Sequence, residues 1–371
     1  METNTYTSLM ERRVRRILLV CNNYDSFALE EDGRIDVQIA QEYAELNLSN
    51  PPSITRAETT DEALEHLSST LSQGEGASPL REEGREAFDL ILVVYSAGGL
   101  DVFDFAAESK RLLPDCPIVL LSAFSKEIYN RIEQHNRSDI DYFFNWNNST
   151  DLIIAIIKLI EDRMNAPHDI LEEGVRAILL VEDSVRYYST YLPLLYKLVL
   201  QQNQIAIRDA LNEKQQLLRK RARPKVLLAT CYDEAIETYR RYETNIIGVI
   251  SDIGFVLHKG DPSSTEKLDA GIDLCRLIRK ENPTMPFLMQ SSQEAMSSIA
   301  KQLKVGFVVK TSKTLTQELS AYIEREFGFG DFVAIDPRSG KEIARASDLE
   351  AFERVISTIS SAAFRRLSDN N

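Results

Sequence analysis

Polar side chains follow four separate apolar runs in the second half of the chain. They are, in chain order, Glu182-Asp183, Asp252, Ser291 and Lys310. Each apolar run is typical of a buried strand, and the carboxyl ends of the strands in a parallel sheet meet at one edge. We therefore expect these side chains to form one acidic pocket that also holds a lysine and a hydroxyl group.

Such a pocket suits the transfer of a phosphoryl group to a carboxylate. Crowded carboxylates raise one another's pKa, and a divalent cation removes that repulsion. A set of oxygen ligands that leaves positions open is typical of Mg²⁺. Lys310 can neutralise an anion on the far side of the pocket, and Ser291 can donate its hydroxyl hydrogen. Positioning and charge neutralisation supply most of the catalysis in this type of transfer.

Each of these residues also has a plain structural interpretation. An Asp after a strand can simply cap the next helix, which is the alternative for Asp252 taken alone. Ser291 can cap a helix in the same way, and a lone lysine such as Lys310 is usually a solvated strand end. The occurrence of all four sites in this order favours the functional interpretation.

Composition restricts the classes of protein to which the chain can belong. Its 371 residues suffice for two domains, and 43% hydrophobic with 27% charged residues is typical of a soluble globular protein. No stretch approaches the roughly 20 apolar residues that span a bilayer, and residues 1–16 lack the apolar core of a secretory signal. We therefore expect a cytoplasmic protein that does not act at a membrane. The net charge of −14 argues against nucleic acid as a partner.

The two halves of the chain share one rhythm of strands and helices, which indicates an internal duplication. Continuous apolar runs open both halves, as expected for strands buried on both faces of a parallel sheet. The predicted strands are 17–20, 53–56, 90–94, 117–121 and 142–144 in the first half and 178–181, 226–228, 246–250, 286–289 and 307–309 in the second. Because helices alternate with these strands, we predict an α/β fold with one doubly wound, five-stranded parallel sheet in each half.

The same rhythm predicts the boundaries of the domains. A first domain over 14–163 closes with a helix at 151–163, a linker follows over 164–175, a second domain covers 176–327, and a C-terminal appendage covers 328–371. The appendage is expected to contain a hairpin over 328–342 and a helix over 348–359.

The helix after Ser184 is predicted to be long, reaching Arg221 with a kink at Pro193. Its apolar stripe can pack on the first domain, within its own domain, or on a second copy of the chain in a homodimer. The stripe consists of Tyr187, Tyr188, Tyr191, Leu195 and Leu198.

The second half, from about 176 to 327, resembles the receiver domains of bacterial two-component response regulators. The resemblance implies a flavodoxin-like fold in which Asp252 is the phosphoacceptor. It implies that Asp183 and Asp252 bind Mg²⁺, with Glu182 acting largely through water. The remaining roles that it implies are the backbone carbonyl of Gly254 as a metal ligand, Ser291 as the switch hydroxyl, Phe307 as the switch aromatic residue and Lys310 as the phosphate partner. Receivers usually have proline after this lysine, where this chain has Thr311.

The first half resembles the same fold with its site removed. Cys21-Asn22 occupy the place of the acid pair, Val94-Tyr95 that of the phosphoacceptor, and Asn145-Trp146 that of the lysine, while Ser122 is retained. Without carboxylates at these positions there is neither a metal site nor an acyl phosphate. We therefore interpret 14–163 as a degenerate pseudo-receiver, with Asp25 as a stray acid nearby.

A narrower similarity extends over the whole chain. Its clearest segments are Tyr24-Asp25-Ser26-Phe27, Glu182-Asp183-Ser184 and Phe327-Gly328-Phe329-Gly330. They are similar to the N-terminal region of bacterial phosphoenolpyruvate synthase-like proteins, in which receiver-like domains precede a pyruvate phosphate dikinase-type nucleotide-binding domain. The chain lacks a glycine-rich phosphate loop and the histidine motif of a dikinase. We therefore expect no enzyme activity beyond the self-phosphorylation of a receiver.

The sequence thus predicts phosphorelay signalling. A histidine kinase or a small phosphodonor would supply the phosphoryl group for Asp252, and output would pass through contacts with a protein partner or an enzyme domain. A Mg²⁺-dependent phosphohydrolase with an Asp nucleophile is one alternative, but it needs a second acid, and Ile253-Gly254-Phe255 offers none. The other alternative is an inert receiver-like scaffold that regulates a phosphoenolpyruvate synthase-like enzyme.

Overall fold

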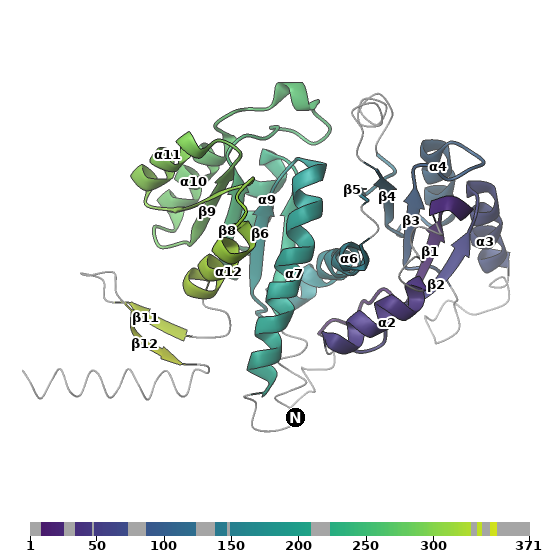
Figure 1. Cartoon of the computed structure of the whole chain (residues 1–371), viewed down its shortest axis with the longest axis horizontal. Coiled ribbons are helices and arrows are strands. Elements are labelled where there is room, and N and C mark those ends of the chain that lie inside the picture. The colour runs from purple at the N-terminus through teal and green to yellow at the C-terminus, as the bar shows by residue number, and fades with distance from the viewer. Residues whose placement is uncertain are drawn as a thin grey trace, which may run out of the picture.

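The structure is a computed structural model of the chain (Figure 1). It describes residues 9–25, 34–46, 48–72, 87–123, 138–146, 149–208, 223–327, 332–335 and 342–346. These residues form two five-stranded parallel sheets with flanking helices, and a separate two-stranded sheet. The predicted α/β class with two doubly wound sheets is confirmed.

The first sheet has the strand order β2-β1-β3-β4-β5, and all of its neighbouring strands are parallel. Its strands are β1 (Arg16–Val20), β2 (Ser53–Ala57), β3 (Leu90–Val94), β4 (Ile118–Ser122) and β5 (Tyr142–Asn145). The helices that connect them are α2 (Ile35–Glu45), α3 (Thr60–Ser72) and α4 (Val102–Leu112). This order is that of the flavodoxin-like doubly wound fold, in which the central strands are covered on both faces.

The second sheet repeats this order as β7-β6-β8-β9-β10, as expected for a duplicated fold. Its strands are β6 (Ala177–Val181), β7 (Lys225–Ala229), β8 (Ile246–Asp252), β9 (Phe287–Ser291) and β10 (Gly306–Val309). The helices around it are α7 (Val185–Arg208), α9 (Tyr232–Tyr242), α10 (Ala270–Glu281), α11 (Ser297–Leu303) and α12 (Leu315–Glu326), with short 3₁₀ turns η2 (Ser263–Thr265) and η3 (Glu294–Met296).

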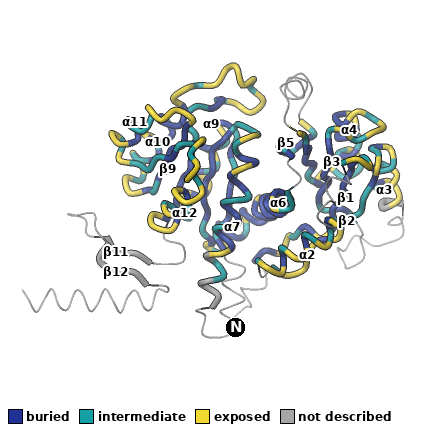
Figure 2. The backbone as a smooth tube through the Cα atoms, viewed as in Figure 1, coloured by how far each residue is buried: buried dark blue, intermediate teal, exposed yellow. Residues whose placement is uncertain are grey.

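Helix α6 (Thr150–Leu171) is longer than its apolar stripe predicted. It was expected to end at Arg163 but continues through most of the predicted linker, so only 172–175 of that segment is not helical. The residues from Leu152 to Asp162 are all buried. A helix that is buried on every side needs packing partners on every side. The two domains supply these partners, because α6 lies between their sheets (Figure 2).

One hydrophobic core therefore extends across both domains. It joins Leu19 of β1 and Ile156 of α6 to Leu180 of β6 and Leu192 of α7. Tyr188, Leu195 and Leu198 of the α7 stripe belong to or pack against this core. Two of the three alternatives that the sequence left open therefore hold together, packing on the first domain and burial within the second. Pro193 lies within α7, and the predicted continuation of this helix over 209–221 lies outside the described residues.

A buried ion pair reinforces this junction. The carboxylate of Asp162 on α6 accepts two hydrogen bonds from the guanidinium group of Arg223, at 2.7 and 3.0 Å. It also accepts the backbone N–H of Val226 on β7 at 2.9 Å and the hydroxyl of Tyr196 on α7 at 3.0 Å. Asp162 has no solvent exposure, so these bonds join α6 to the second domain in a dry environment.

The predicted hairpin corresponds to the antiparallel pair β11 (Phe332–Ile335) and β12 (Glu342–Ala346), and it extends to Ala346, beyond the expected end at residue 342. The helix predicted over 348–359 lies outside the described residues. Among the helices that the structure describes, none is both long and apolar enough to cross a membrane.

Candidate functional site

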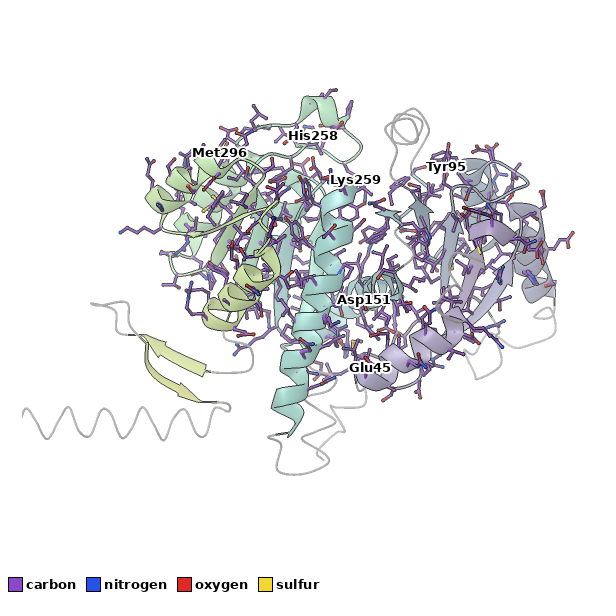
Figure 3. The ribbon with its side chains drawn as sticks, in the orientation of Figure 1. Glu45, Tyr95, Asp151, His258, Lys259 and Met296 are labelled. Carbon is purple, nitrogen blue, oxygen red and sulfur yellow. The ribbon has the colours of Figure 1, made fainter. Side chains whose placement is uncertain are left out.

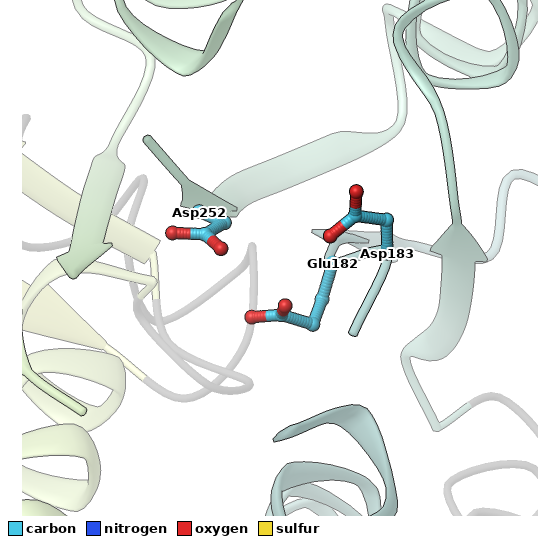
Figure 4. A group of neighbouring side chains, drawn as sticks. All are labelled: Glu182, Asp183 and Asp252. Carbon is cyan, nitrogen blue, oxygen red and sulfur yellow. The ribbon is translucent and has the colours of Figure 1, made fainter. Parts of the chain in front are cut away.

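The predicted polar residues meet at the carboxyl edge of the second sheet. Glu182 and Asp183 directly follow β6, Asp252 and Ser291 are the last residues of β8 and β9, and Lys310 directly follows β10. The three carboxyl groups face a common space (Figure 4), and one oxygen of each lies within 4.8 Å of the others. The acidic pocket expected from the sequence is therefore present.

Lys310 lies at the centre of this pocket. Its Nζ donates to Glu182 Oε2 at 2.5 Å and to Asp252 Oδ2. Burial alone would lower the pKa of Lys310, but the charges of Glu182 and Asp252 outweigh that effect and raise it. The lysine is thus a charged group that bridges two carboxylates, and the alternative of a solvated strand end is wrong.

Glu182 is the most buried of the acids, with no solvent exposure. Its carboxylate accepts the side-chain amide of Gln290 at 3.3 Å and the backbone N–H of Ser184 at 3.2 Å, besides the lysine. Burial, followed by the charge of Asp252, raises the pKa of Glu182 well above its ordinary value. Lys310, Gln290 and Ser184 thus already donate to this carboxylate from inside the protein.

Asp183 and Asp252 are each held by one backbone donor. Asp183 Oδ2 accepts the N–H of Val256 at 3.0 Å, and Asp252 Oδ1 accepts the N–H of Ile253 at 2.7 Å. Burial raises the pKa of Asp183 to about 6, with smaller contributions from Glu266 and Asp252. Burial is also the main cause that raises the pKa of Asp252, against the effect of Lys310. Desolvation, more than the predicted mutual repulsion, therefore raises the pKa values of Asp183 and Asp252.

The two predicted switch residues lie beside this pocket. Ser291 is buried, and its Oγ accepts the backbone N–H of Gln293 at 3.1 Å. Ser291 is not the cap of the following turn, because η3 begins after Gln293 and has no side-chain cap. The bond to Gln293 leaves the hydroxyl hydrogen of Ser291 to donate elsewhere. Phe307 is half-buried on β10. It packs against a separate hydrophobic cluster of the second domain, which includes Phe287 and Met289 of β9. Thr311 follows Lys310 through a trans peptide bond.

Glu266 is an acid of the site that the sequence analysis missed. A carboxylate oxygen of Glu266 lies 2.3 Å from the place that a Cβ atom of Gly254 would take. Glu266 is exposed as a residue, but partial burial of its carboxylate and then the charge of Asp252 raise its pKa. No sequence signal identifies Glu266, because it lies in the irregular segment between β8 and α10. Only the path of that segment in space places Glu266 beside Gly254.

A cleft of about 690 Å³ opens beside this pocket. Asp183 and Glu266 line one part of it, and Tyr142 and Arg163 of the first domain line another. The segment that carries His258 and Lys259 borders the cleft on the side of the second domain (Figure 3). The pocket is thus accessible through a space between the two domains.

The corresponding edge of the first sheet has a different construction. Cys21 is fully buried, and Asn22 donates its side-chain amide to Asp25 at 2.8 Å and to the carbonyl of Ser96 at 3.0 Å. The backbone N–H of Asn145 donates to Ser189 Oγ on α7 at 2.9 Å. In the part of the chain that the structure describes, the only group of three acids or other metal-binding side chains is Glu182, Asp183 and Asp252.

Comparisons with known proteins give structural neighbours but no family. No protein-family model matches the chain, and no curated protein matches its sequence. A response regulator receiver domain protein from Clostridium thermocellum is 19% identical, with a TM-score of 0.27 over 41% of this chain and 94% of that one. A two-component system response regulator/GGDEF domain protein is 15% identical, with a TM-score of 0.31 over 84% of this chain and 98% of that one.

A third neighbour is a response regulator from Burkholderia pseudomallei that contains a phosphorylated aspartic acid, a calcium ion and citrate. It is 14% identical, with a TM-score of 0.25 over 62% of this chain and 97% of that one. Scores this low carry no functional argument. The neighbours named here are response regulators, and none of them supports the similarity to phosphoenolpyruvate synthase-like proteins.

Proposed function

We propose that this chain is a cytoplasmic phosphorelay protein in which Asp252 accepts a phosphoryl group. One observation carries the proposal: Lys310 bridges Asp252 and Glu182, while Asp183 faces the same space from the adjacent strand. A carboxylate, a fixed cation and further acids at the carboxyl edge of one sheet are the groups that this transfer requires.

In the proposed reaction, an oxygen of Asp252 forms a bond to phosphorus as the bond to the donor breaks. The donor's leaving atom keeps the electron pair, and the product is an acyl phosphate. Lys310 moves its hydrogen bonds from the carboxylates to the phosphoryl oxygens, and the Ser291 hydroxyl donates to them as well. Charge-assisted hydrogen bonds of this kind are short and strong.

The oxygen donors of the pocket fit a magnesium ion. Asp183, Asp252 and the carbonyl of Gly254 would hold it, with Glu182 acting through water. When bound, Mg²⁺ supplies positive charge next to the phosphoryl oxygens and removes the cost of the crowded carboxylates. The chain's own contribution is to keep these oxygens on fixed strand ends, which limits the reorganisation that binding requires.

We propose that a histidine kinase or a small phosphodonor reaches Asp252 through the cleft beside Asp183. Output then follows from movement of Ser291 and Phe307, which changes the surface around α11 and reaches a protein partner or an enzyme domain. The similarity to phosphoenolpyruvate synthase-like proteins suggests such an enzyme as the partner. The first domain is proposed to be a pseudo-receiver that supports the second through their common core.

Treatment of the full chain with acetyl phosphate and Mg²⁺, followed by intact-mass and peptide analysis, tests this function. We expect one phosphoryl group per chain, located on Asp252, and none in Asp252→Asn. A wild-type chain that stays unmodified would contradict the proposal and favour the inert scaffold.

The second alternative is an Asp-nucleophile phosphohydrolase, and Glu266 is the nearby acid that the sequence analysis did not find for it. A hydrolase would turn over p-nitrophenyl phosphate many times per chain, whereas the proposed receiver would not. Sustained turnover that is lost in Asp252→Asn would therefore favour the hydrolase.

A further inference from the structure

Glu266 occupies a space that the side chain of residue 254 leaves free. Gly254 is the second residue after Asp252, the last residue of β8. A Cβ atom at this position would lie 2.3 Å from Glu266 Oε1 and 3.5 Å from the Cα of Leu268. The carboxylate of Glu266 therefore reaches the main chain of Gly254 only because residue 254 is a glycine.

Backbone hydrogen bonds keep Glu266 at this position. Lys267 and Phe255 exchange two of them, at 3.1 and 3.3 Å, and form an isolated antiparallel bridge. The N–H of Glu266 donates to the carbonyl of Ser263 at 3.2 Å. These bonds attach the returning segment to the residues just after Asp252, so the position of Glu266 follows from the backbone and not from a flexible side chain alone.

The charges nearby leave Glu266 without a cation of its own. Lys267 forms an ion pair with Asp273, and Lys259 forms one with Glu234 at 2.9 Å. Within the described part of the chain, Glu266 has no ion pair with a lysine, arginine or histidine. Among the residues that the structure describes, Lys310 is the one cation that contacts Glu182 and Asp252, and it is already shared between them.

Glu182 and Glu266 therefore differ in what they can offer to a metal ion. Glu182 is fully buried and hydrogen-bonded to Lys310 and Gln290. Glu266 is exposed, and its carboxylate lies beside Gly254 without a cationic partner. Because Mg²⁺ keeps several of its waters, a carboxylate at the rim of a site can bind the ion through those waters.

We infer that Glu266 is a fourth carboxylate of the magnesium site, supplied by the segment between β8 and α10 through the gap at Gly254. It accepts hydrogen bonds from the waters of an ion held by Asp183, Asp252 and the Gly254 carbonyl. This inference rests on the proposed function and deepens it, because it assigns a second carboxylate, besides Glu182, that acts on the same metal through water. Glu266 is a positioning residue in this role, since it acts on the ion through water.

Titration calorimetry of the full chain with MgCl₂ tests the inference. Loss of an outer carboxylate costs about tenfold in metal affinity, and we expect that loss in Glu266→Gln. Gly254→Ala should also weaken binding, because the new methyl group displaces the carboxylate. Glu237→Gln is the matched control, since Glu237 is an exposed acid that lines the same cleft on α9. Its affinity should equal that of wild type.

Two further measurements separate the possible failures. Melting in EDTA should show Glu266→Gln at least as stable as wild type, because a structural acid would lower the melting temperature when removed. If Asp183→Asn abolishes Mg²⁺ binding and Glu266→Gln binds like wild type, the role of Glu266 is wrong and the proposed metal site stands. If Asp183→Asn itself binds like wild type, the metal assignment of the proposed function fails.

Discussion

The Nζ atom of Lys310 lies 4.1 Å from the centre of the Tyr187 ring, over its face. Tyr187 belongs to the first turn of α7, and the next two residues face the first domain. Tyr188 donates its hydroxyl to the carbonyl of Phe143 on β5, and Ser189 Oγ accepts the N–H of Asn145. One helical turn therefore contacts both the lysine of the proposed phosphoacceptor site and the edge strand of the first domain.

This contact predicts that activation reaches the first domain through α7. Beryllofluoride with Mg²⁺ mimics a phosphoryl group on Asp252 and should draw Lys310 away from the Tyr187 ring. Hydrogen exchange should then change over 291–310 and also in β5. In Tyr187→Leu the change in β5 should shrink, while the change over 291–310 remains. Tyr24→Leu is the control, since Tyr24 is 81% exposed. A wild-type β5 that does not respond would exclude this route.

Magnesium binding should depend on Asp183. We expect Asp183→Asn to bind no Mg²⁺ detectably, because the variant loses a charged oxygen ligand that faces the pocket. Removal of the ion with EDTA should lower the melting temperature of wild type and leave that of the variant unchanged, since binding to the folded state alone stabilises it. Equal Mg²⁺ affinities in the two proteins would contradict this.

The raised pKa of Asp183 predicts a pH dependence with a definite sign. Its pKa is about 6 in the folded protein and 3.8 ordinarily. Below the ordinary value the carboxyl is protonated in both the folded and the unfolded state. As the pH rises through the folded pKa, the metal-free folded protein must accommodate a buried charge, so its stability falls.

The Asp183→Asn variant has no carboxyl group at this position. Comparison with it therefore isolates the effect of the Asp183 titration on stability. In EDTA, the stability of wild type relative to Asp183→Asn should fall as the pH rises from about 4 to 7. Urea denaturation at several pH values measures this difference. A difference that stays constant over the range would contradict a buried, perturbed Asp183. Mg²⁺ affinity should change in the opposite sense and rise until Asp183 is deprotonated.

The first domain should accept no phosphoryl group. Its strand ends present Cys21, Asn22 and Asn145 where the second domain has acids and a lysine. The full chain is the right material for this test, because α6 belongs to the common core and an isolated first domain would expose it. Asp252→Asn treated with acetyl phosphate should keep its unmodified mass, and an aspartyl phosphate at Asp25 would overturn the pseudo-receiver interpretation.

The Asp162–Arg223 pair predicts a strong dependence of stability on one buried carboxylate. Asp162→Ala leaves the guanidinium of Arg223 buried without its partner, which typically costs about 3–5 kcal/mol. Urea denaturation should show this loss. Glu326→Ala removes the exposed partner of Arg325 and should change stability by less than about 1 kcal/mol. Similar small effects in both variants would show that the Asp162 pair does not stabilise the junction.

The sequence by itself determined the two sheets and the position of the acidic pocket. Continuous apolar runs such as 178–181 form central strands, because only a strand covered on both faces is apolar throughout. Parallel strands align their carboxyl ends at one edge of the sheet. Asp183, Asp252 and Lys310 each follow or end such a strand, so the sequence predicts that they lie close together. These conclusions follow from local patterns and one rule of topology.

Only the tertiary structure decided what surrounds that pocket. The approach of Glu266 to Gly254 depends on the path of an irregular segment, which carries no periodic signal. The continuation of α6 beyond Arg163 depends on burial between two domains, and the sequence gives the apolar stripe without its partners. The contact of Tyr187 with Lys310 likewise needs α7 to lie at one particular place. Such contacts join residues far apart in the chain, and their geometry follows from packing rather than from any local preference.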